Sequence, residues 1–192
     1  MHRTGFTLAE LLIALLILGV IATFTIPKIL NNQQSSQKKS VFIESIAMLS
    51  EITYHARLDN LGISQAKTYY LNRINGIKIC QDSQVEGCWP QSDATLPAGQ
   101  VTQGGALLAN GATVAGISNG QDLGSGELRD TLILDWNGAS GPNTVGNDQI
   151  ALNICYGTGI CAANGNQASG TVKALGTSGS SFNLYNEIFA AN

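Results

Sequence analysis

The sequence predicts an α+β protein. One long N-terminal helix, transmembrane in its first half and amphipathic in its second, packs on a small antiparallel β-meander head. Three observations lead to this prediction: an unbroken apolar run at the N-terminus, an apolar stripe at helical spacing after it, and a Gly-rich second half containing short apolar segments. Of the 22 glycines, 17 lie at or beyond Gly99, which favours short strands and turns there.

The apolar run extends from Phe6 to Ile26 and carries a single charge, Glu10. At about 1.5 Å per residue, such a helix is on the order of 30 Å long, which matches the hydrocarbon core of a bilayer. A buried core helix of a soluble protein is the alternative, but unbroken apolar runs of this length are rare outside membranes. We therefore expect a membrane-spanning helix.

Glu10 is the anomaly within this run. A carboxylate at this depth in lipid costs roughly 2.5–3.5 kcal/mol or more, and such residues usually have a function and a partner. The run contains no Lys or Arg, but cleavage after Gly5 would create an α-amino group on Phe6, about one helical turn from Glu10. The alternative is a tolerated glutamate that reaches the membrane interface.

Residues 5–30, GFTLAELLIALLILGVIATFTIPKIL, resemble the start of type IV pilins and of type II secretion pseudopilins. The resemblance implies a leader, residues 1–5, that a prepilin peptidase removes between Gly5 and Phe6, followed by N-methylation of Phe6. It also implies a transmembrane helix that becomes the core of a filament, in which Glu10 neutralises the Phe6 amine of a neighbouring copy. Pro27 also falls where the family pattern has it.

The predicted organisation is a leader (1–5), a transmembrane and polymerisation helix (6–27), an amphipathic helix (28–62) and a Gly-rich α+β globular head (63–192). Pro27 should kink the helix, and the chain could bend or unwind between residues 27 and 36. The helix should end at Leu61, with Gly62 just beyond it. The stripe that should face the head comprises Phe42, Ile46, Leu49, Ile52 and Ala56.

Four strands, a possible edge strand and one short helix are expected in the head. A second helix could occupy residues 63–74, capped by Ser64. Residues 106–109 and 112–117, joined by Asn110-Gly111, form a strong hairpin signal, and residues 130–136 and 149–156 should be the third and fourth strands. Residues 172–175 could be an edge strand. The apolar residues of the tail should dock back on the head; they are Phe182, Leu184, Tyr185, Ile188 and Phe189.

Charge is divided along the chain. Residues 28–78 contain seven bases and three acids, whereas residues 82–192 contain nine acids and two bases. An acidic head argues against nucleic acid as its main ligand. It could attract the basic helix of a neighbouring copy, or the two regions could simply be solvated surfaces.

The four cysteines allow three disulfide pairings. We prefer Cys80 with Cys88 and Cys155 with Cys161, because each pair closes a short loop and an exported head should be oxidised. A zinc site is the rival interpretation, but it wants tighter Cys pairs and usually a histidine.

A loop between the last strands carries the residue types of a weak calcium site. Asp135, Asn137, Asn143 and Asp148 lie on a Gly-rich stretch that resembles a segment found between the last strands of many pilin-like proteins. No other cofactor is expected. The alternative is that these side chains hydrogen-bond their own backbone to form a tight loop.

These observations favour a non-enzymatic structural subunit of a type IV pilus-like filament. His55 lies in the middle of a helix that should be committed to packing, and no phosphate-binding loop is present. Expected partners are copies of itself, related pilins, prepilin peptidase, an inner-membrane assembly platform and lipid. The precursor should cross the bacterial inner membrane once with its head outside the cytoplasm, and the assembled filament should be periplasmic or at the cell surface. The alternatives are a type II secretion pseudopilin, a low-copy minor pilin or adhesin that binds a surface, DNA or an exoprotein, and a single-pass protein that never polymerises.

Overall fold

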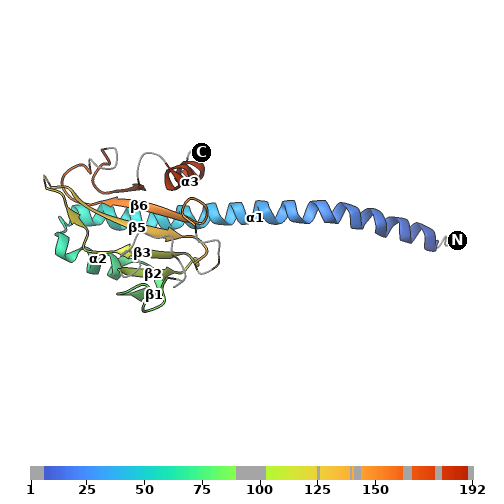
Figure 1. Ribbon diagram of the computed structural model, residues 1–192, viewed down its shortest axis with the longest axis horizontal. Helices are drawn as coiled ribbons and strands as arrows, with labels where there is room; N and C mark the ends of the chain where they lie inside the picture. Colours follow the sequence, from blue (N-terminus) through green and yellow to red (C-terminus); the bar gives the residue numbers. More distant parts are fainter. Residues whose placement is uncertain are drawn as a thin grey trace, which may run out of the picture. The chain divides into compact units, whose positions relative to one another are not determined.

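The computed structural model describes residues 7–89, 103–124, 126–138, 140, 144–161, 166–175 and 179–189, apart from the side chains of residues 31 and 182 (Figure 1). Its contacts divide the chain into two compact units, Met1–Gln37 and Lys38–Asn192, and we call the second one the head unit. The two units are described separately, except that helix α1 runs through both.

Helix α1 spans Leu8–Leu58, 51 residues, and its helical assignment continues through Pro27 and the polar stretch that follows. The predicted kink at Pro27 therefore stays a prediction, and of the two possibilities between residues 27 and 36, bending or unwinding, the helix does not unwind. Leu and Ala supply much of the helix propensity of the first half.

The C-terminal end of α1 differs from the prediction by three residues. Asn60 has a left-handed φ of 50°, its N–H donates to the Arg57 carbonyl (3.1 Å), and the Leu61 N–H donates to the Ala56 carbonyl (3.0 Å). This pattern is a Schellman motif, in which Asn occupies the position that Gly usually takes. Asn60, and not Gly62, ends the helix because its short polar side chain tolerates the left-handed conformation.

A short 3-10 turn, η1 (Ile63–Gln65), leads into α2 (Ala66–Arg73). The predicted cap at Ser64 is wrong: Gly62 and Gln65 occupy the two N-cap positions, and neither makes a side-chain capping bond.

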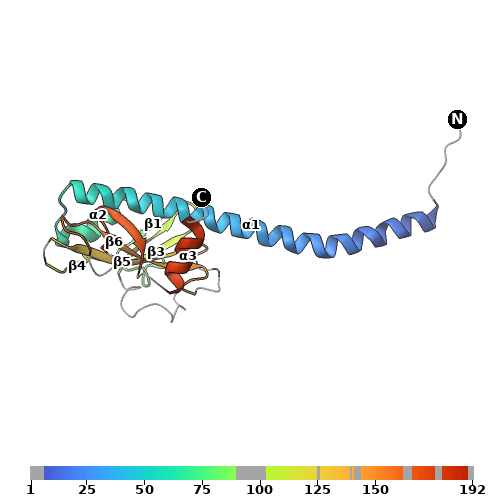
Figure 2. The same ribbon diagram turned by 90° about the horizontal axis from the view of Figure 1, so that it is seen from above.

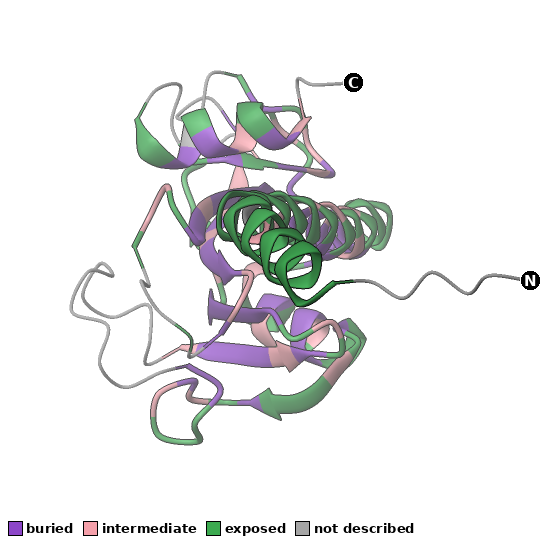
Figure 3. Cartoon of the chain, turned by 90° about the vertical axis from the view of Figure 1, so that its right-hand side faces the viewer, coloured by how far each residue is buried: buried purple, intermediate pink, exposed green. Residues whose placement is uncertain are grey.

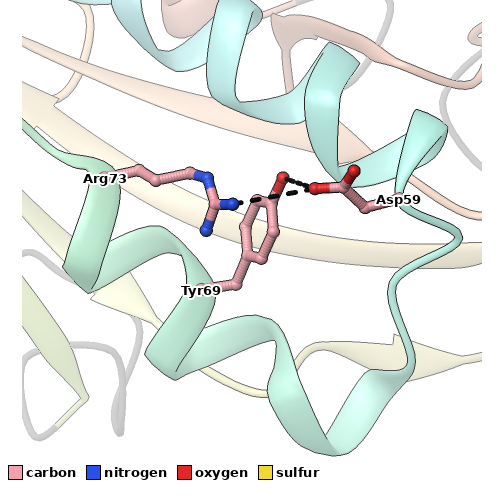
Figure 4. A network of polar contacts seen from close by, with 3 residues as sticks. All are labelled: Asp59, Tyr69 and Arg73. Carbon is pink, nitrogen blue, oxygen red and sulfur yellow. Dashed lines mark hydrogen bonds and ion pairs between the residues drawn. The ribbon is translucent and has the colours of Figure 1, made fainter.

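Tyr69 links α2 to the end of α1 (Figure 4). Its hydroxyl donates to Asp59 (2.5 Å), while the Arg73 guanidinium lies 3.6 Å from the centre of the Tyr69 ring and 3.7 Å from the Asp59 carboxylate. Because the ion pair is exposed, we expect it to orient the two helix ends more than to stabilise them.

The head unit contains one antiparallel sheet in the order β1-β2-β3-β5-β6-β7, with β4 paired to β5. The predicted hairpin, the third and fourth strands and the edge strand are confirmed as β2–β3, β5, β6 and β7. The sequence did not predict β1 or β4. The strands are β1 (Gly76–Cys80), β2 (Gly104–Leu108), β3 (Thr113–Ile117), β4 (Gln121–Asp122), β5 (Leu128–Asp135), β6 (Gln149–Cys155) and β7 (Thr171–Ala174).

One face of the sheet packs on the C-terminal part of α1 (Figures 1 and 2). The predicted stripe on α1 is confirmed, because all five of its residues are at most 5% exposed. Val114 of β3, Leu132 and Leu134 of β5 and Leu152 of β6 belong to the same core. In Figure 3 this part of α1 carries buried (purple) segments, whereas its N-terminal turns are exposed (green).

The opposite face of the sheet holds a second, smaller cluster. The Trp89 indole, 2% exposed, packs on Ala115 of β3 and Ile133 of β5, which are register partners, with Ala151 beside them. Small residues at 115 and 151 leave room for the large ring.

The C-terminal helix α3 spans Ser180–Phe189 and contacts β6 and β7. Leu184 and Ile188 are buried in the main core, and Tyr185 and Phe189 pack partly against it, as expected for these four residues. The Phe182 side chain, also predicted to dock, lies outside what the structure describes. The Ser181 hydroxyl oxygen accepts the Ala151 N–H (3.0 Å), which fixes the start of α3 to β6.

Both preferred disulfides form, Cys80–Cys88 and Cys155–Cys161, and no free cysteine is present in the described part of the chain. Each bond closes a loop next to the end of a strand, β1 in one case and β6 in the other.

Candidate functional site: the N-terminal helix

The first unit presents an apolar helical surface that nothing in the described structure covers. The large apolar residues between Leu8 and Leu30 are between 49% and 78% exposed. An 18-residue segment of this helix has a mean hydropathy of 2.5, so the helix is long and apolar enough to cross a membrane. A surface of this kind is stable only in lipid or against other apolar surfaces.

Glu10 and Thr7 form a reciprocal cap at the start of α1. The Thr7 N–H and hydroxyl both donate to the Glu10 Oε2 (2.8 Å each), and the Glu10 N–H donates to the Thr7 Oγ1 (3.3 Å). This is the capping box Thr-x-x-Glu, which satisfies N–H groups that the helix itself leaves unpaired. The Glu10 carboxylate is thereby held at the N-terminal end of the helix.

Sequence reasoning placed Thr7 in the family pattern but missed its capping role, although the spacing of Thr7 and Glu10 was a readable signal. Gly5 and Phe6, the predicted cleavage and methylation residues, lie outside the described residues, as does the leader, 1–5. Cleavage, methylation and the pairing of Glu10 with a Phe6 amine therefore stay predictions.

The loop predicted to bind calcium is built by hydrogen bonds to its own backbone. Asp135 accepts the Asn137 N–H (3.0 Å) and the Gln149 side-chain amide (3.1 Å), and Asp148 accepts the Thr144 N–H (2.6 Å). Burial raises the pKa of Asp135 to about 6, and the nearby Asp148 charge adds to the increase.

This arrangement supports the tight-loop alternative for the same residues. The described residues contribute two carboxylates, and no group of three or more His, Cys, Asp or Glu in the described ranges could hold a metal. Asn143, the remaining predicted ligand, lies outside the described residues, and calcium binding stays a prediction.

A second buried acid, Asp130, organises the turn between β3 and β4. Its carboxylate accepts the Ser118 N–H, the Ser118 hydroxyl and the Thr131 N–H, each at 2.8 Å. The side chain is buried, and this desolvation raises the pKa of Asp130 to about 6 in spite of the three donors.

His55 does not sit in an arrangement of catalytic residues in the described part of the chain. It is exposed on α1 and makes an edge contact with the Tyr54 ring, with 5.9 Å between ring centres. The described structure therefore gives no support to a nucleophile and base pair that would involve it.

The structure defines a class of protein: a sheet-containing head unit on a helix whose N-terminal part is apolar, uncovered and capped by Thr7 and Glu10. Comparison with known proteins agrees with this class. Residues 1–26 match the family model described as the prokaryotic N-terminal methylation motif.

The chain is similar to the type II secretion system core protein G of two bacteria. It is 31% identical over 58 residues to the protein of Vibrio cholerae serotype O1. The aligned region covers 30% of this chain and 39% of that protein. The match to the protein of Dickeya chrysanthemi is 32% over 59 residues, 31% of this chain and 38% of the relative. The chain thus spans about two fifths of the length of these curated relatives, and no solved structure matches it significantly.

Proposed function

We propose that this protein is a structural, non-catalytic subunit of a pilin-like filament that polymerises through the apolar part of α1. The precursor sits in the bacterial inner membrane with its head unit outside the cytoplasm. A prepilin peptidase cleaves it between Gly5 and Phe6, Phe6 is N-methylated, and an assembly platform draws the subunit into a helical filament with copies of itself and related pilins. The filament lies in the periplasm or at the cell surface.

The observation that carries this proposal is the uncovered apolar helix with one acid fixed at its start. During assembly the apolar side chains exchange lipid for neighbouring helices, so burial is maintained throughout. Glu10 then favours one register, because only a position opposite a free Phe6 amine avoids an unpaired charge in an apolar core.

A type II secretion pseudopilin is the more specific candidate within this proposal. It is favoured by the two relatives, both named as type II secretion core protein G, whose similarity extends over about 58 residues and so beyond the methylation motif. Deleting the gene should then stop export of secreted enzymes. Unchanged export together with lost surface pili would instead favour a type IV pilin.

Two measurements test the filament proposal. Mass analysis of the membrane-extracted protein should find an N-terminus at methylated Phe6 in cells with the peptidase and at Met1 in cells without it. Glu10→Val should leave the protein stable in the membrane but strongly reduce its incorporation into filaments.

Thr23→Val is the matched control for Glu10→Val. It also replaces a polar side chain of the same exposed helix, one that bonds only the Val20 carbonyl (2.7 Å), but it removes no charge. Filaments should form normally from this variant. Normal filaments from Glu10→Val, or normal assembly of a chain that keeps residues 1–5, would contradict the charge-pairing mechanism.

A further inference from the structure

The head unit has a groove between α1 and the β2–β3 hairpin, with a volume of about 400 Å³. Glu44, Glu51 and His55 line it from α1, and Asn110 lines it from the hairpin turn. Arg73 at the end of α2 and Asn75 just after that helix also line it. We call it the α1–hairpin groove.

Two acids give this groove its chemical character. Glu44 and Glu51 are exposed and seven residues apart, so they lie on the same side of α1 with about 10 Å between them along the axis. The Asn110 side-chain amide holds Glu44 in place, donating to its carboxylate (3.2 Å) and to the Ser45 hydroxyl (3.1 Å). The Glu51 carboxylate makes no hydrogen bond or ion pair with any described residue. The cation at the far wall, Arg73, is already engaged by Asp59 and Tyr69.

Three lysines on the same helix also lack partners in the described structure: Lys28, Lys38 and Lys39. Helical neighbours pair at separations of three or four residues. Lys39 and Lys38 precede Glu44 by five and six residues, which places them on other sides of the helix. These lysines therefore cannot neutralise the groove acids of their own chain, although the acids and the lysines lie within one helix.

We propose that the α1–hairpin groove binds the lysine-bearing segment of α1, residues 28–39, from a second copy of this chain. This inference rests on the proposed function, because side-by-side apolar helices bring copies together in parallel. In two parallel helices, a stagger of five or six residues places Lys39 or Lys38 at the level of Glu44. A stagger of twelve or thirteen residues places Lys39 or Lys38 at the level of Glu51. These staggers correspond to axial shifts of about 8–20 Å between copies. The complementary charges favour these staggers over unstaggered packing.

Photo-crosslinking of the full chain in assembling cells tests the occupant of the groove. p-Benzoylphenylalanine replaces Asn75, an exposed lining residue for which a larger side chain is tolerable. Irradiation should give a dimer of this chain, and mass spectrometry should locate the link within residues 28–39 of the second copy. A link to another segment, a link to a different protein, or no link while filaments form would overturn the docking inference and leave the proposed function standing. Absence of filaments in the unmodified chain would overturn both.

Charge reversal supplies an independent test. Glu51→Lys should lower filament yield about 1.4- to five-fold, the range that an exposed ion pair of about 0.2–1 kcal/mol gives. Lys38→Glu with Lys39→Glu should do the same, and combining the reversals on both sides should restore much of the yield. Glu187→Lys, an equal charge change at an exposed position of α3 outside the groove, is the control. An effect of Glu51→Lys no larger than that of the control, in protein with both disulfides formed, would overturn the inference.

Discussion

Asp130 should make the stability of the head unit fall as pH rises between about 4 and 6. The carboxyl is buried beside Tyr70 and Tyr156, and desolvation raises its pKa to about 6 from the ordinary 3.8. Between these two values the folded state holds a proton that the unfolded state has already released. Stability must therefore be greatest below pH 4 as far as this group is concerned, and it is lost as the pH passes through 6.

The size of the effect follows from the difference between the two pKa values. About 2.2 pH units at 1.36 kcal/mol each give about 3 kcal/mol, an upper figure for one carboxyl. Asp135 has a raised pKa of about 6 and acts in the same direction, so the wild-type profile alone does not isolate Asp130. Asp130→Asn removes the titration, at the cost of the acceptor for the Ser118 N–H.

The free energy of unfolding is measured for the wild type and for Asp130→Asn by urea titration of the full chain in mild detergent with a calcium chelator. Unfolding is followed by near-ultraviolet circular dichroism at steps from pH 4 to 7. The free energy of unfolding of the wild type should fall by about 2.4 kcal/mol more than that of Asp130→Asn between pH 4 and 7, because at pH 4 the unfolded carboxyl is already partly ionised. Glu187→Gln, at an exposed position, should follow the wild type. Parallel profiles for wild type and Asp130→Asn would refute the reasoning, because they would show that burial does not shift this carboxyl.

Three further predictions concern the core, the disulfides and the loop after β5. Leu49→Ala should lower the free energy of unfolding by about 2–5 kcal/mol, since Leu49 is fully buried. Leu58→Ala, at a 60% exposed position, should cost much less. Similar losses for the two variants in denaturant unfolding would contradict the core assignment. Replacing both Cys155 and Cys161 by Ser should lower stability by about 2–3 kcal/mol, and an unchanged urea midpoint would show that the six-residue separation adds nothing. If Asp135 and Asp148 help to bind calcium, millimolar calcium should raise the melting temperature of the wild type but not of Asp135→Asn; no shift in the wild type would leave the hydrogen-bonded loop as the explanation.

The parts of the fold that local sequence could predict were those with a strong periodic signal. The stripe from Phe42 to Ala56 repeats at helical spacing, and Asn110-Gly111 sits between two apolar segments, so both emerged from the sequence. Strand β1 did not, because its residues are mostly exposed at a sheet edge and alternate too briefly to be distinctive. The helix continues through residues 32–37 because mediocre helix formers do not interrupt a helix that is already nucleated on both sides.

The candidate site divides in the same way. Glu10 could be singled out because one charge in an apolar run is conspicuous in sequence, and the disulfide pairs could be preferred because their partners are close along the chain. The groove acids could not be singled out from the sequence, since Asn110 reaches Glu44 across a separation of 66 residues. Contacts of this kind depend on the register of the sheet and its placement on α1, which short-range patterns do not specify.

The packing of Trp89 on the sheet, next to a disulfide, has a practical consequence for handling the protein. The indole directly follows Cys88 in the chain and is held on the sheet at Ala115 and Ile133. Opening the adjacent disulfide would loosen its tether, and a ring released to water emits at longer wavelength. A red shift in intrinsic fluorescence on adding a reductant would therefore report the opening of the Cys80–Cys88 bond in purified material, without labels and before any filament is formed.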